Sequence, residues 1–199
     1  MSKIFQNLEL QAFRAGITPR TKESRAWFQK KIKNMRSIKR EDLMDEDPLK
    51  KTGREVVGNM YMFFYDPKFK NDRQKLPYYD AFPLVVVVGP AKDGFYGLNL
   101  HYLPPVLRAK MLDALMDITN NTKYDQSTRF KMSYQLLTKT AKLKYFKPCF
   151  KHYLNKHVDG RFAMVPPPEW EIATFLPTAD FRYASNAKVY SDSKGMIGD

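Results

Sequence analysis

The chain has 199 residues, of which 43% are hydrophobic, so it is long and apolar enough to bury the core of one domain. Its 34 lysines and arginines against 21 acidic residues give a net charge of +13, which attracts polyanions such as nucleic acid, anionic lipid or acidic protein. A single cysteine excludes an internal disulfide, three histidines leave little from which to build a zinc site, and no apolar run approaches the roughly 20 residues of a membrane span.

The positive charge is concentrated in two parts of the chain. Residues 1–55 carry 14 basic and 8 acidic side chains, and residues 122–161 carry 10 and 2. Residues 56–121 carry 7 and 6 and are nearly neutral. Such a concentration favours contact with nucleic acid or its immediate surroundings, with a merely solvated surface as the alternative.

The first 55 residues predict a basic helical N-terminal arm. Apolar residues at steps of three and four indicate one helix over 1–15 and a second over 22–37, capped by Thr21. The second helix has an apolar stripe, and a cationic face is expected at Lys22, Arg25, Lys33 and Arg36. A polar linker over 45–53 follows, so we expect an arm that need not pack on the core.

The core domain is expected over 56–183 and begins with strands. Residues 59–65 are rich in aromatics and methionine, residues 84–88 form an unbroken apolar run, and residues 95–103 alternate. The run at 84–88 predicts a strand that is buried on both faces. These segments predict an antiparallel meander, with a further strand over 161–165.

Helices are expected to pack on this sheet. Pro104 and Pro105 begin one, residues 127–143 form a second, residues 146–157 a short third and residues 169–176 a fourth. Residues 184–199 are polar and are expected to form an extended C-terminal tail. The fold class is therefore α+β: a small antiparallel sheet, barrel-like if it curls, with three or four helices. The helix expected over 127–143 carries further cations, at Lys131, Lys139 and Lys142.

The sequence offers little for catalysis. A metal-dependent nuclease needs clustered carboxylates, and Asp66, two residues before Lys68, with Asp80 is the nearest approach to such a cluster. Cys149 stands among aromatic residues and is typical of core packing rather than of a nucleophile. His101 joins a strand to a helix, where a hydrogen bond that locks the junction is its expected role. We predict no catalytic residue, no metal site and no cofactor.

Tyrosines are dense just before the buried strand. The run LPYYDAFP at 76–83 is consistent with a lid over the core, with a stacking platform for bases or with a protein interface. No pattern of a zinc finger or of a basic region with heptads is present, so DNA, if bound, would be contacted through its phosphates.

Long segments of the chain resemble a known family. The resemblance rests on GNMYMFFYDPK at 58–68, LPYYDAFPLV at 76–85 and GLNLHYLPPVLR at 97–108, and it continues through YQLL at 134–137 and KHYL at 151–154. These runs are similar to virion structural proteins of T4-like contractile-tailed phages, a group with which the DNA end protector is associated. The resemblance covers about residues 58–176 and implies no catalytic residues.

Charge and resemblance together predict a non-enzymatic structural component of a tailed-phage virion, assembled in the host cytoplasm and placed near the packaged DNA end or the path of the DNA. Its expected partners are other virion proteins and double-stranded DNA, with no membrane and with an oligomeric state set by the assembly. A tail or baseplate component that docks on acidic neighbours is the alternative, and a nuclease is a weaker one.

Overall fold

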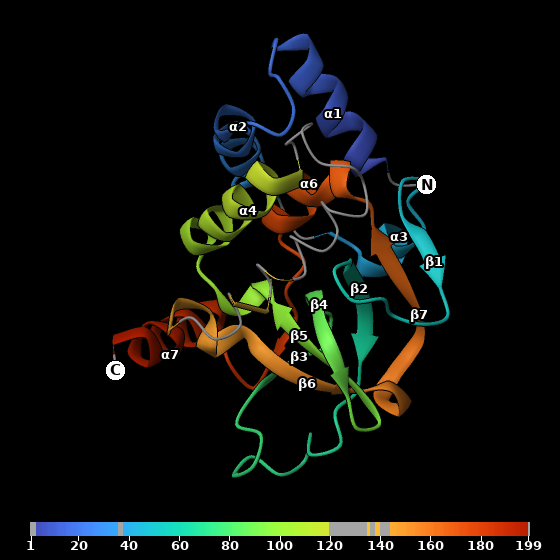
Figure 1. Cartoon of the computed structure of the whole chain (residues 1–199), viewed down its shortest axis with the longest axis vertical. Coiled ribbons are helices and arrows are strands. Elements are labelled where there is room, and N and C mark those ends of the chain that lie inside the picture. Colours follow the sequence, from blue (N-terminus) through green and yellow to red (C-terminus); the bar gives the residue numbers. More distant parts are fainter. Residues whose placement is uncertain (1–2, 36–37, 120–134, 136–137, 140–143, 199) are drawn as a thin grey trace.

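The computed structural model describes residues 3–35, 38–119, 135, 138–139 and 144–198 (Figure 1). Within these residues the chain forms helices and an antiparallel sheet of six strands, which confirms the α+β class. A separate two-stranded ribbon joins β3 (Tyr79–Asp80) to β8 (Phe181–Arg182). In spatial order the strands of the large sheet are β1 (Lys50–Thr52), β7 (Val158–Val165), β2 (Met60–Tyr65), β4 (Leu84–Ala91), β5 (Gly94–Asn99) and β6 (Phe150–Leu154).

Strand β4 lies inside the sheet, between β2 and β5. Side chains alternate across a strand, so its apolar run is divided between two faces. Val86 packs in the main core beneath the helices, whereas Val85 and Val87 pack in a second, aromatic cluster on the opposite face. The expectation that this run is buried on both faces is confirmed.

The sheet curls around the aromatic cluster without closing. The ring centroids of Phe95 on β5 and Phe162 on β7 are 5.9 Å apart, although β2 and β4 lie between these strands. In a flat sheet three strand spacings would separate them by about 14 Å. The short distance therefore requires strong curvature, and β1 and β6 remain as open edges.

Helices cover the other face of the sheet and form the upper part of the molecule in Figure 1. Helix α2 starts at the predicted cap, because the Thr21 hydroxyl accepts a hydrogen bond from the Ser24 N–H in a complete capping box. It ends at Ile32, earlier than expected. In the described part of the chain no helix is long and apolar enough to cross a membrane. The helices here are α1 (Ile4–Arg14), α2 (Lys22–Ile32), α3 (Arg40–Met44), α4 (Pro105–Thr119) and α6 (Trp170–Phe175).

The N-terminal segment packs on the core, contrary to the expectation for an arm. Phe5 and Leu8 of α1 and Phe28 and Ile32 of α2 are buried in the same cluster as Val86. Strand β1 adds to the sheet by pairing with β7. The apolar stripes of these helices therefore face this chain's own core rather than a neighbouring subunit.

Three other expectations were wrong in whole or in part. Residues 146–157 do not form a helix; a 3₁₀ turn over Lys144–Cys149 leads into strand β6, and a second 3₁₀ turn over Asn155–His157 follows it. The C-terminal tail is not extended but forms helix α7 (Asn186–Gly198). The strand expected over 95–103 stops at Asn99 and continues as a 3₁₀ turn over Leu100–Tyr102.

The C-terminal helix packs on the core through the buried Val189 and is also held by hydrogen bonds. Ser193 is buried and donates a hydrogen bond to the Tyr102 carbonyl, and the Tyr190 hydroxyl accepts one from Arg108 at 2.8 Å. Arg108 also donates to the carbonyl oxygens of His101, Leu103 and Thr174. Its guanidinium thus fastens α4 to both α6 and α7.

Candidate nucleic-acid interface

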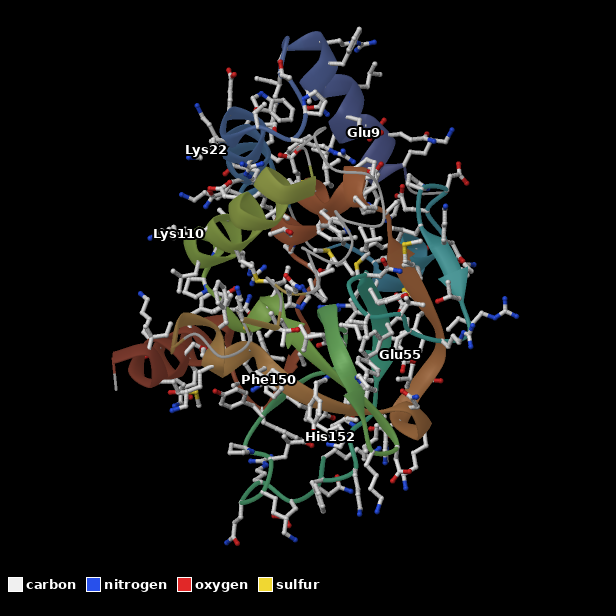
Figure 2. All side chains as sticks on the ribbon, viewed as in Figure 1. Glu9, Lys22, Glu55, Lys110, Phe150 and His152 are labelled. Carbon is white, nitrogen blue, oxygen red and sulfur yellow. The ribbon has the colours of Figure 1, made fainter. Side chains whose placement is uncertain are left out.

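The predicted cations do not form one available surface. Lys22, Lys33 and Lys139 are exposed, and Figure 2 shows Lys22 on α2 and Lys110 on the neighbouring α4 pointing outward on the same side of the molecule. Arg25 is only 3% exposed and forms ion pairs with Asp113 on α4 and Glu171 on α6. It turns inward because α2 packs against both of these helices. Arg36, Lys131 and Lys142 lie outside the described residues.

A better-defined basic site lies between the β2–β3 loop, strand β6 and helix α7. In Figure 1 this loop, residues 66–78, lies below β6 and α7. Two adjoining cavities of about 220 and about 560 Å³ open here, and both are lined by Leu76, Tyr102 and Lys151. The smaller cavity is walled by Tyr65, Lys68, Tyr79 and Tyr153, and the larger by Tyr78, Pro148, Tyr183 and Lys188.

Lys151 stands where the two cavities meet. Its Nζ lies 4.0 Å from the centroid of the Tyr102 ring, and no carboxylate of the described residues forms an ion pair with it. Burial lowers the pKa of Lys151 to about 8, so the ammonium is still charged at neutral pH. The cavity therefore contains a positive charge for which, among the residues that the structure describes, the face of the Tyr102 ring is the recorded contact.

More cations line the rim. The loop carries Lys68, Lys70, Arg73 and Lys75. The Arg73 guanidinium lies 4.4 Å from the centre of the exposed Tyr183 ring, and both Lys68 and Lys75 lie over the Phe69 ring. Lys70 pairs with Asp66 and Lys75 with Asp72. Cations held over aromatic faces are suited to phosphates and bases alike.

A buried polar network holds the wall of the smaller cavity in place. The Asp80 carboxylate accepts hydrogen bonds from the N–H groups of Phe82 and Asp180, from the Asn99 amide and, at 2.6 Å, from His101 Nδ1. Asn99 also donates to the hydroxyl of Tyr153 at 3.1 Å. The network fixes β3 and β5 against the cavity wall.

Both ionisable groups of the network favour the deprotonated form, which is neutral for His101 and negatively charged for Asp80. Burial lowers the pKa of His101, which stays neutral and accepts from the Thr178 hydroxyl at Nε2. Burial disfavours the charge of Asp80, but His101 and the other hydrogen bonds outweigh it, so the pKa of Asp80 is lowered. The expected role of His101 as a lock at the strand–helix junction is confirmed.

The residues considered for catalysis lie apart. Asp66 is exposed and pairs with Lys70, whereas Asp80 belongs to the buried network. Cys149 is buried, donates to the Phe146 carbonyl, and has a pKa raised by burial to about 12, as core packing requires. Within the described ranges no three His, Cys, Asp or Glu residues are placed to hold a metal ion.

Sequence reasoning missed Lys151, Lys68 and Arg73 as site residues. The loop was recognisably basic, but its position beside β6 depends on contacts that are distant in sequence. Lys151 was hidden because 146–157 was interpreted as a helix.

Comparison with known proteins identifies the family. No curated protein and no solved structure matches the chain. The model of one protein family, described as the phage T4 terminal DNA protecting protein, matches residues 3–197. Because this match extends over nearly the whole length, the chain belongs to the family of phage terminal DNA protecting proteins.

Proposed function

We propose that this protein is a non-enzymatic structural component of a tailed-phage virion that binds the end of the packaged double-stranded DNA and shields it. The family match over residues 3–197 carries the proposal. The contacts would be made with phosphates, because the candidate interface presents lysines and arginines without a motif for reading bases. Assembly in the host cytoplasm beside other virion proteins completes this proposal.

Two groups of cations are candidates for the DNA contacts. Lys68 and Lys151 line the adjoining cavities, and Arg73 lies over the ring of Tyr183 in the wall of the larger one. Lys22, Lys33 and Lys139 are the exposed members of the cations expected from the sequence. Reversal of each group to Glu, tested separately, identifies which group faces the DNA.

The test compares a linear duplex with a covalently closed circle of equal length. We expect tighter binding to the linear form and slower digestion of its ends by a processive exonuclease. Log affinity should fall linearly with log salt, with a slope of about −4 to −5 if four to six phosphates are contacted. Equal affinity for both forms would indicate a protein that coats DNA along its length rather than one that binds the ends.

Two results would overturn the proposal outright. If the chain has no measurable affinity for DNA at low salt, its charge serves acidic neighbours, and the tail or baseplate function takes first place. If DNA is cut in the presence of Mg²⁺ and Asp66→Ala or Asp80→Ala abolishes the cutting, the protein is a nuclease.

A further inference from the structure

We propose that the cavity at Lys151 binds a terminal phosphate monoester of a DNA strand. The proposal deepens the proposed function and rests on it, because it names the chemical group by which an end would be distinguished from the rest of the duplex.

Lys151 differs from the other inward-facing cations in its lack of acceptors. Arg25 is neutralised by Asp113 and Glu171, and Arg108 donates to three carbonyl oxygens and a phenol oxygen. For Lys151 the described residues supply only the face of the Tyr102 ring. Lys151 is half-buried, and a partly desolvated charge without an anionic partner is costly, so the observation points to a ligand that brings the missing anion.

Two tyrosines that line the smaller cavity together with Lys151 supply neutral donors. The hydroxyl of Tyr65 accepts from the Leu154 N–H and the hydroxyl of Tyr153 accepts from the Asn99 amide, which leaves both O–H protons to donate. Burial raises the pKa of both phenols, so they keep these protons. An ammonium with phenol donors suits an oxyanion that has several acceptor oxygens.

Two acidic residues line the cavities. Asp192 lines the larger one and forms an ion pair with Lys188, and Asp80 lines the smaller one. Its two oxygens are occupied by the four donors of the buried network. Its charge is therefore balanced from within the fold, and it forms no ion pair with Lys151.

The recess favours a chain terminus over an internal phosphate. An internal diester continues on both sides, whereas a terminal monoester can enter a recess with one side free. A monoester also carries about −1.5 to −2 charges at pH 7, against one for a diester. The cavity of about 220 Å³ can contain the phosphate, and the adjoining cavity of about 560 Å³ leaves room for the attached nucleotide. Lys68 lines the smaller cavity, and Arg73 lies over Tyr183 of the larger one, where both could meet the next diesters.

The experiment uses the full-length protein and short duplexes that a hairpin closes at one end. The open end carries a 5′-phosphate, a 3′-phosphate or hydroxyls only, and a dumbbell closed at both ends serves as the control without an end. We expect at least one phosphorylated end to bind about tenfold more tightly than the hydroxyl end, and the two phosphate positions show which strand terminus enters.

Variants of Lys151 test whether this residue provides the preference for a terminal phosphate. Lys151→Met should weaken binding of the phosphorylated end much more than binding of the hydroxyl end, and so remove the preference for phosphate. Lys156→Met, which changes an exposed lysine five residues away, should keep the preference. Lys151→Gln provides a second variant with a polar tip if the methionine variant does not fold. A parallel titration with a deoxynucleoside 5′-monophosphate, followed by NMR, measures the cavity without duplex DNA.

The outcomes separate this inference from the proposed function. If all open ends bind equally and more tightly than the dumbbell, the phosphate site is wrong and the end protector stands. If no duplex binds but the monophosphate binds in a manner that depends on Lys151, the cavity stands and the end protector fails. If neither the monophosphate nor the phosphorylated ends depend on Lys151, the inference is overturned.

Discussion

The ammonium group of Lys151 lies against the face of the Tyr102 ring, 4.0 Å from its centroid, in a place where a carboxylate would be expected. A desolvated cation–π contact contributes about 2 kcal/mol. The fall in the pKa of Lys151 from 10.5 to about 8 corresponds to about 3 kcal/mol by which burial disfavours the charged form. The contact with the ring therefore does not fully compensate for the hydration that the ammonium loses on burial.

Replacing this lysine should stabilise the free protein. We predict that Lys151→Met raises the free energy of unfolding at pH 7 by about 1–3 kcal/mol, measured by urea denaturation. The unfolded chain binds the proton more tightly, so wild-type stability rises between pH 8 and 10.5 and the advantage of the variant shrinks there. Lys156→Met should change stability little at either pH. A Lys151→Met variant that is less stable than wild type would mean that the lysine contributes to the stability of the fold.

Arg25 and Lys22 lie on the same helix, yet we predict opposite behaviour. Arg25→Met leaves Asp113 and Glu171 without their cation and should cost about 3–5 kcal/mol. Lys22→Met, at an exposed position, should stay within about 0.5 kcal/mol of wild type. Denaturant midpoints measure both. A stable Arg25→Met that only weakens DNA binding would contradict the buried pair.

Val86 and Val106 test the burial of β4. Val86→Asp places a charge between the helices and the sheet, and we predict that the variant does not fold cooperatively. Val106 is 60% exposed in the first turn of α4, so Val106→Asp should be tolerated. Circular dichroism melting curves distinguish the two. A cooperatively folded Val86→Asp protein would mean that β4 is not an inner strand.

Removal of residues 1–55 should abolish cooperative folding, because the segment supplies buried side chains from α1, α2 and α3 and the edge strand β1. A finer comparison uses two phenylalanines of α1. Phe5→Ala should cost about 3–5 kcal/mol, whereas Phe13→Ala, at a site 79% exposed, should cost little. A fragment of residues 56–199 with a melting temperature near that of the intact chain would restore the interpretation of an arm.

The buried network predicts sensitivity to acid. Below pH 6.5 the unfolded chain takes up a proton on its histidine, whereas burial lowers the pKa of His101 in the folded protein, so stability falls with pH. Asp80 adds a second loss at lower pH, as its lowered pKa is passed. Glu169 acts in the opposite sense, because burial and Glu9 raise its pKa to about 8. The measurement is therefore the difference in free energy of unfolding between wild type and His101→Gln. This difference should narrow as the pH falls from 7 to 5.

The elements that the sequence predicts well are those whose signal is local. The apolar run at 84–88 has no polar alternation, and Thr21 lies directly before a helical pattern, so neither depends on distant residues. Strand β6 was missed because Phe150 and Leu154 share a face in a helix and in a strand alike, since four residues is close to one helical turn and equals two strand repeats. Only the pairing with β5 decides between them.

Helix α7 and the site depend on contacts that no short segment contains. The tail has few apolar residues, and its helix is held by Ser193 on Tyr102 and by Tyr190 on Arg108. In the same way, Arg25 is turned inward by acidic residues 88 and 146 positions away. The position of Lys151 beside Tyr102 likewise requires the complete sheet.

Strand β7 lies between β1 and β2, and Tyr61 pairs with Met164, which follows it by about half the length of the chain. During synthesis the edge of β2 that pairs with β7 therefore stays unpaired until residues 158–165 leave the ribosome. Phe162, which completes the aromatic cluster, arrives at the same late moment. Pairing at such long range slows folding and leaves an open strand edge on the nascent chain, so the protein is exposed to aggregation until its last quarter has been made.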